Sequence, residues 1–208
     1  MSARLPHTPL DQLTEQQRAI YVRITGGSRS TGTPHFPLTA EDGTLNGPFG
    51  IMLHEPELGS NLERLGAAIR YRTNLSPRVR EIAILQVAHA MDSEFEWWAH
   101  AKVAKAAGLT EAELDALASG TLVGEDDLER ASAAFCQILL RDQHQLTNDE
   151  FATMSAQLSP ASMIELTVLV GYYRTLAQLM AVFDIGVPPM APPSDIGTAE
   201  PPAESRGV

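Results

Sequence analysis

The chain has 208 residues, of which 44% are hydrophobic and 20% are charged, and its formal net charge at pH 7 is −11. This length and composition are typical of one globular domain with a sizeable core, and they argue against a disordered chain. The acidic balance argues against a nucleic-acid partner, because binding phosphates needs a basic surface. An anionic small molecule would have to be attracted by local arginines, against the field of the whole protein.

The single cysteine, Cys136, leaves no possibility of an intramolecular disulfide or dithiol pair. We interpret it as a small apolar residue on the inner face of a helix. The N-terminal residues lack the apolar run of a signal peptide, and no stretch approaches the roughly 18 uninterrupted apolar residues of a membrane span. The sequence therefore predicts a cytoplasmic protein with no membrane partner.

The first third of the chain combines two predicted helices with an irregular segment. Thr14 and Gln17 form a capping-box pattern that opens a short helix toward Tyr21. Glycine and proline recur too often over residues 25–50 for regular structure, so we predict an irregular arm there. Loops of that length are usually functional or wrap a neighbouring subunit. Pro56 begins a second helix, which is expected to end near Arg72.

Residues 76–184 are predicted to form a succession of capped helices. Start and stop signals predict helices over residues 76–91, 93–107, 110–120, 125–145, 147–158 and 159–184. There is no alternating strand pattern and no repeat of fixed period. Residues 188–208 are rich in proline and are predicted to be a disordered tail. Residues 1–187 are thus expected to form a single all-α domain, a multi-helix bundle.

Four polar residues stand out on two consecutive apolar helices: Glu81, Ser93, Glu96 and His100. The last three have the spacing i, i+3 and i+7, which places them on one face of a helix. A helix of this apolar content normally buries such a face. Because burial of an unpaired carboxylate or imidazole is costly, we expect these groups to pair or to line a cavity.

The stretch from residue 75 to residue 120 resembles the carboxymuconolactone decarboxylase family. Its thiol-dependent branch, the alkylhydroperoxidase D type, has a Glu, then Cys-x-x-Cys with a His between the cysteines, and then a second His. Glu81 and His100 match the outer positions, whereas Ser93 and Glu96 stand where the cysteines would be, and Phe95 stands for the middle His. The string from Phe95 to His100 instead resembles the branch that lacks the cysteine pair.

The resemblance covers about residues 47–187. Residues 165–173 resemble the last long helix of the family, and residues 47–49 and 56–58 resemble the N-terminal segment of its longer members. The resemblance implies an alkylhydroperoxidase D-like bundle that assembles into trimers or hexamers, with active sites near the subunit contacts. It also implies that Glu81 orients His100 or exchanges a proton with it.

We therefore predict a site with catalytic residues His100, Glu96 and Glu81 and with no metal and no cofactor. Arginine grips carboxylates through two parallel hydrogen bonds, so two arginines join the expected substrate-binding set. That set is Ser93, Phe95, Trp97, Arg72, Arg80 and His54. The plainer alternatives are a solvated i, i+4 pair for Glu96 with His100, and a first-turn carboxylate that complements the helix N-terminus for Glu81.

Three functional hypotheses remain open. The first is a cofactor-free enzyme similar to the decarboxylases of aromatic compound catabolism, which uses His100 as proton donor on a small, anionic carboxylated carbonyl or lactone compound. The second is a peroxide or disulfide reductase with peroxiredoxin activity, which the missing cysteine pair disfavours. The third is a non-catalytic oligomer that binds a small molecule.

Overall fold

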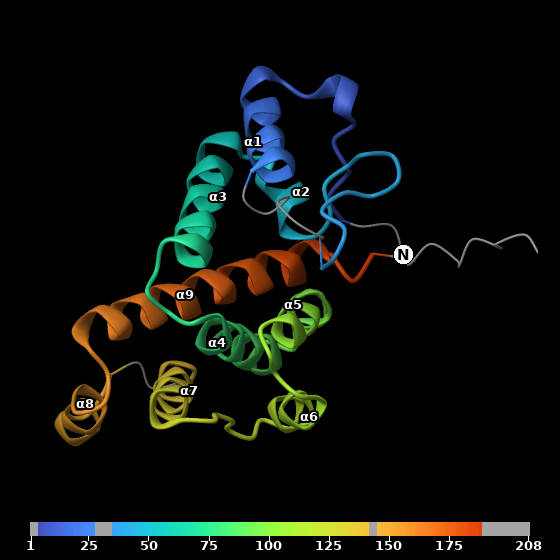
Figure 1. Ribbon diagram of the computed structural model, residues 1–208. Helices are drawn as coiled ribbons and strands as arrows, with labels where there is room; N and C mark the ends of the chain where they lie inside the picture. The colour runs from blue at the N-terminus through green and yellow to red at the C-terminus, as the bar shows by residue number, and fades with distance from the viewer. Residues whose placement is uncertain (1–3, 28–34, 142–144, 189–208) are drawn as a thin grey trace, which may run out of the picture.

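The computed structural model describes residues 4–27, 35–141 and 145–188, and this part of the chain is all-helical (Figure 1). It contains a short 3-10 turn, Leu10–Gln12, and a single isolated antiparallel bridge between Thr39 and Leu45. The prediction of an all-α fold is confirmed. The α-helices within the described ranges are α1 (Glu15–Gly26), α2 (Pro48–Met52), α3 (Pro56–Tyr71), α4 (Pro77–Ala90), α5 (Glu94–Ala106), α6 (Glu111–Ala118), α7 (Asp127–Leu139), α8 (Asn148–Ser155) and α9 (Pro160–Phe183).

Helix α4 forms the centre of the lower half of the molecule. It begins where the Ser76 side chain accepts a hydrogen bond from the Val79 backbone N–H, with Pro77 in the first turn. Every residue from Glu81 to Ala88 is buried, because α4 packs against α5, α6, α7 and α9. A polar side chain on this helix therefore lies in the protein interior and needs a partner there.

Helix α9 crosses the middle of the molecule, with α1, α2 and α3 on one side and α4, α5 and α7 on the other (Figure 1). It has the length and apolar composition of a membrane span. Its inner face, which includes Leu166, Leu169 and Leu176, belongs to the main hydrophobic core. We therefore describe α9 as the core helix that joins the two halves of a helical domain.

The predicted helix starts agree with the structure at the capping boxes of Thr14, Thr110 and Thr147. The predicted helix over residues 125–145 is shorter, since α7 ends at Leu139. Helix α2 lies at the end of the predicted irregular arm. The prediction missed this short helix because the glycines and the proline there indicate irregular structure. Residues 28–34 of that arm and residues 189–208 of the predicted tail lie outside the described residues.

The described part of the arm, residues 35–47, passes over the start of α5. Gly47 has a φ of +59°, and a Cβ atom at this position would collide with the ring of Phe95. Only glycine combines this backbone angle with so close an approach. Phe36 of the arm makes edge-to-face contacts with Phe95 and Trp98, at centroid distances of 6.5 and 5.8 Å. The arm is thereby held against the helix that carries His100.

Candidate active site

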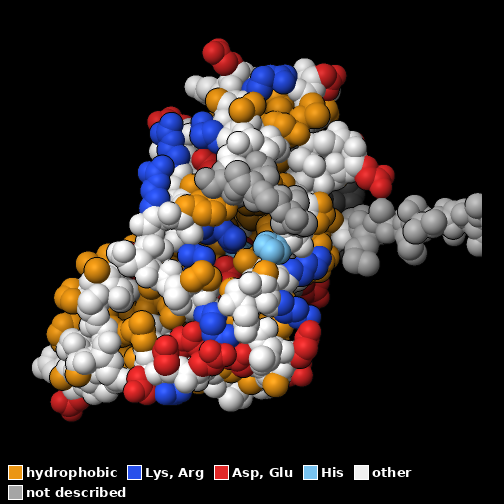
Figure 2. Space-filling view, in the orientation of Figure 1, with side chains coloured by type: hydrophobic (Ala, Val, Ile, Leu, Met, Phe, Trp, Pro, Cys, Tyr) orange, Lys and Arg blue, Asp and Glu red, His pale blue; other side chains and the backbone are white. Residues whose placement is uncertain are grey.

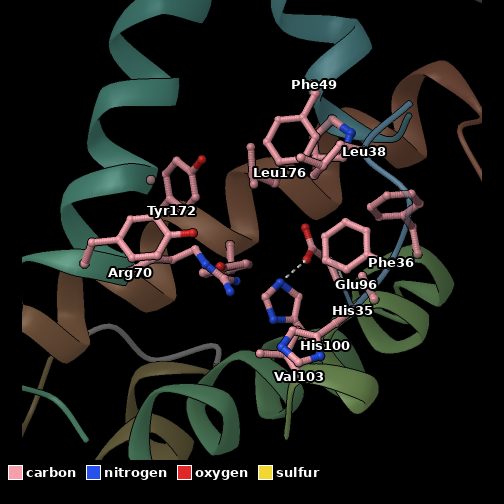
Figure 3. Close-up of a pocket in the computed structure, with 16 residues that line it drawn as sticks. His35, Phe36, Leu38, Phe49, Arg70, Glu96, His100, Val103, Tyr172 and Leu176 are labelled. Atoms are coloured by element: carbon pink, nitrogen blue, oxygen red, sulfur yellow. Dashed lines mark ion pairs between the residues drawn. The ribbon is translucent and has the colours of Figure 1, made fainter. Parts of the chain in front are cut away.

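A cavity of about 280 Å³ lies between the arm, α2, α3, α5 and α9 (Figure 3). In the space-filling view, basic side chains and a histidine gather around the hollow at the centre of this face (Figure 2). Aromatic and aliphatic side chains form most of the wall, and a few polar groups converge on it. The lining residues are His35, Phe36, Leu38, Pro48, Phe49, Gly66, Arg70, Tyr71, Phe95, Glu96, Ala99, His100, Val103, Tyr172, Tyr173 and Leu176.

Glu81 and His100 form a buried pair behind the cavity wall. The distance between Glu81 Oε2 and His100 Nδ1 is 2.7 Å, and the Glu81 side chain has no exposed surface. Because an ionised carboxylate only accepts hydrogen bonds, Nδ1 carries the hydrogen and donates it to Glu81. This fixes the tautomer and leaves Nε2 of the neutral ring as an acceptor on the opposite side.

Glu96 lies on that opposite side. Its Oε2 atom is 3.5 Å from His100 Nε2, at the outer limit of a hydrogen bond, and its Oε1 atom has no hydrogen-bond partner. Burial raises the pKa of Glu96 to about 8, against a smaller opposing effect of Arg70 and with a further increase from the charge of Glu81. At neutral pH the Glu96 carboxyl therefore holds a proton, which it can share with His100 Nε2.

The two partners of the buried pair have different charge states. Burial lowers the pKa of His100 below its ordinary value, against the opposing attraction of Glu81, so the ring is neutral at pH 7. Burial also opposes ionisation of Glu81. The hydrogen bond from His100 and the positive charges of Arg70 and Arg80 outweigh it, so the pKa of Glu81 lies below its ordinary value. The site thus contains an ionised Glu81, a neutral His100 and a protonated Glu96.

Aromatic rings hold His100 in place between these carboxyl groups. The Tyr173 ring on α9 meets the His100 ring edge-on at a centroid distance of 5.2 Å, and Phe36 of the arm lies at 6.5 Å. These rings leave the His100 side chain largely buried, with 4% of the residue exposed, while it still lines the cavity. The electrostatic interactions inside are correspondingly stronger than they would be in water.

The cation of the cavity is Arg70, which the sequence patterns did not single out. It lies in the last turn of α3 and reaches toward Glu96 and His100 (Figure 3). Arg72, two residues further on, is an exposed C-cap residue outside the cavity. Arg80 is also outside it, but its Nε atom approaches Glu81 Oε1 to 3.7 Å. The sequence signal for Arg70 is its i+4 spacing from Gly66, whose missing side chain leaves room on the same face.

The comparisons with known proteins concern the fold and one segment of the chain. The model of the carboxymuconolactone decarboxylase family matches residues 56–137. The fold is similar to the crystal structure of an alkylhydroperoxidase AhpD core, an uncharacterized peroxidase-related protein from Ralstonia eutropha JMP134. The TM-score is 0.70 at 13% identity, with 88% of this chain and 90% of that chain covered. No curated protein matches the sequence.

Residues 56–137 thus match the carboxymuconolactone decarboxylase family, and the fold of the chain is that of an AhpD-like core. The matched segment contains Arg70, Glu81, Glu96 and His100. The arm residues and Tyr173, which close the cavity, lie outside that segment.

Besides Arg72 and Arg80, three more residues of the expected substrate-binding set lie outside the cavity. Ser93 is the N-cap residue of α5. Trp97 packs against the apolar cluster that contains Ile82 and Leu85. His54 contacts the backbone oxygen of Pro6 through Nε2 at 2.9 Å. Of the six residues in that set, only Phe95 lines the cavity.

The cavity also lacks a thiol. Cys136 on α7 is fully buried and is not a lining residue, and burial raises the pKa of its thiol to about 12. A thiol in this environment stays protonated and is a poor nucleophile. Within the described ranges, no group of three or more His, Cys, Asp and Glu side chains has the arrangement of a metal site.

Proposed function

We propose that this protein is a cofactor-free enzyme of the decarboxylase type, which transfers a proton to a carbon atom of a small carbonyl compound. The supporting observation is the chain of Glu81, His100 and Glu96 at the wall of a cavity that is lined by both apolar and polar side chains. A protonated carboxyl next to a neutral imidazole is a pair that can deliver a proton and then recover one. This use of the three groups accounts for the cost of burying them.

In the proposed reaction, the bond between a substrate carbon and its carboxylate breaks, and carbon dioxide leaves. The electron pair of that bond passes into the neighbouring carbonyl group, which becomes an enolate. Glu96 then gives its proton to the carbon, and the carbonyl is restored. Glu96 regains a proton from water through His100 Nε2, while Glu81 holds the His100 ring and stabilises its transient positive charge.

The thiol-dependent alternative has less support in this chain. The similar structure belongs to a peroxidase-related protein, and such chemistry needs a thiolate with a resolving thiol nearby. Ser93 and Glu96 stand at the two positions of the superfamily's cysteine pair, and Cys136 is alone and buried. The residues of the cavity therefore favour proton transfer over peroxide reduction.

The reaction can be tested before the natural substrate is identified. We would incubate the protein in D₂O with a panel of small carboxylated carbonyl and lactone compounds, and measure both released carbon dioxide and deuterium in the product. We expect one carbon-bound deuterium for each carbon dioxide released. Reduction of peroxide in a thiol-coupled assay, with no compound decarboxylated, would contradict the proposal and favour the thiol-dependent alternative.

We also propose that the protein is a cytoplasmic homo-oligomer. The outer face of α9 exposes Ile164, Val168 and Val182. The two charged residues of this helix bind partners within the chain. Glu165 accepts hydrogen bonds from Asn74, and Arg174 donates one to the backbone oxygen of Leu139. A long uncharged face of this kind is typical of a subunit contact.

The oligomer is expected to be a trimer or a hexamer. Sedimentation of the protein at micromolar concentration should show a species of three or more chains. A single species with the 22.5 kDa mass of one chain would contradict the expectation.

A further inference from the structure

Arg70 is a cation whose hydrogen-bonding capacity is incompletely used. Its Nε atom is buried and has no hydrogen-bond partner. Its guanidinium lies 5.9 Å from the centre of the Tyr71 ring. Burial opposes its positive charge, but the neighbouring Tyr173 and Glu81 raise its pKa above the ordinary value. Among the residues that the structure describes, no carboxylate forms an ion pair with it, although Arg80, which lies outside the cavity, has one with Glu81.

Glu81 attracts both Arg70 and Arg80, so the charges around the cavity leave one positive charge unmatched. The negative charge of Glu81 is matched by Arg80 at 3.7 Å and by the hydrogen bond from His100. Glu96 is protonated and carries no charge at neutral pH. The cavity thus has a net positive charge inside a protein of net charge −11. A largely enclosed cation in this situation is stabilised when an anion binds beside it.

The shape of the wall limits what this anion can be. Apolar side chains of the arm, α2 and α9 face the space in front of the guanidinium, among them Leu38, Phe49 and Leu176 (Figure 3). A cavity of about 280 Å³ accommodates a compact molecule but not a long chain. A small ion such as acetate would pair with the arginine but would leave these apolar walls without contacts.

We propose that Arg70 is the specificity-determining residue of the cavity and binds the carboxylate of a compact ligand whose body is apolar. This proposal deepens the proposed function, on which it rests for the reaction at the Glu96 end of the cavity. An ion pair with Arg70 stabilises a carboxylate anion more than it stabilises neutral carbon dioxide. The carboxylate bound there is therefore an anchor, and a substrate of the proposed reaction carries a second carboxylate, which leaves as carbon dioxide at the Glu96 end of the cavity.

The test uses three probes on the full chain: benzoate, its neutral analogue benzamide, and acetate. Calorimetric titration should show benzoate binding about 10- to 100-fold tighter than benzamide, which is the usual value of a hydrogen-bonded charged pair. Acetate should bind more weakly than benzoate, because it lacks the apolar body. In Arg70→Gln the preference for benzoate over benzamide should disappear, and in Arg70→Lys it should be reduced.

Arg72→Gln is the matched control, because it removes a positive charge two residues away from a side chain outside the cavity, and it should keep the full preference. Thermal melting establishes that each variant is folded, and Arg70→Lys replaces Arg70→Gln if the latter does not fold. Equal affinities of the wild-type protein for benzoate and benzamide, absence of saturable benzoate binding, or a preference that survives loss of the guanidinium would overturn the proposal.

The reaction and the anion site can fail separately. Glu96→Gln leaves the charge of the cavity unchanged at neutral pH, so it should retain the benzoate preference while turnover is lost. An Arg70-dependent preference without decarboxylation of any compound would overturn only the proposed reaction. Decarboxylation that is unaffected in Arg70→Gln, with equal probe affinities, would overturn only the role of Arg70.

Discussion

Replacement of His100 by alanine is expected to lower kcat by about 10² to 10⁴, the usual range for the loss of a positioned proton-transfer group. The variant removes the Nε2 atom through which Glu96 regains its proton, and it also removes the Nδ1 hydrogen bond to Glu81. Both effects act on the same step. The measurement is single-turnover decarboxylation, once the substrate panel has given an active compound, with circular dichroism to show that the helices are intact.

His100→Asn is the matched control for the buried carboxylate. An unpaired Glu81 would cost roughly 1 to 3 kcal/mol of stability, so His100→Ala is expected to melt at a lower temperature than the wild-type protein. The asparagine amide can replace the donor to Glu81 but cannot carry a proton between Glu96 and water. The Asn variant should therefore recover stability without recovering kcat. Wild-type kcat in a folded His100→Ala protein would remove His100 from the mechanism.

Local sequence signals account for most of the fold. Ser76 and Thr110 are sufficient to locate two helix starts, because a side-chain oxygen must satisfy the backbone N–H groups that begin a helix. The burial of α4 follows from its apolar composition. The single turn of α2 was missed because Gly47 and Gly50 predict irregular structure, and what stabilises the turn is contact with α3 and α9. Such contacts depend on the completed fold and not on local sequence.

Some residues of the candidate site could likewise be predicted from local sequence, and others depend on the completed fold. Glu96 and His100 could be found from the sequence because they lie one turn apart on one helix, and the resemblance added Glu81 from the preceding helix. Arg70 could not be separated from the neighbouring arginines, since the side of α3 that faces the cavity is set by α5 and α9. Tyr173 is more than 70 residues from His100, and only the packing of α9 brings the two rings together.

Burial also changes which group carries the transferable proton. The sequence favours His100 as the proton donor, because the ordinary pKa of histidine is closest to neutrality. In the folded protein, burial lowers the pKa of His100 and raises that of Glu96. Burial removes water and so disfavours the charged form of each group. The charged form is the protonated one for histidine and the deprotonated one for glutamate. We therefore assign the resting proton to Glu96, and the recovery of that proton to His100.

This assignment predicts opposite effects of Glu96→Gln on activity and stability. Wild-type kcat should fall as pH rises above about 8, because Glu96 then loses the proton it must donate. The Gln variant should have a low kcat with no such fall. The other groups that face Glu96 keep their charge between pH 7 and 9, since burial raises the pKa of Tyr173 and lowers that of His100, while Glu81 remains ionised and Arg70 remains protonated.

The stability effect follows from the sign of the same shift. The pKa of Glu96 is about 8 in the folded state and near its ordinary value of 4.5 in the unfolded chain. The folded state therefore holds the extra proton between these values, and wild-type stability falls as pH rises from about 4.5 to 8. Glutamine is neutral throughout, so the variant should be as stable as the wild type at pH 4.5. By pH 8 it should be more stable by a few kcal/mol, at about 1.4 kcal/mol for each pKa unit. Urea unfolding at several pH values measures this difference, and a constant difference between the two proteins would show that Glu96 is ionised in the folded state.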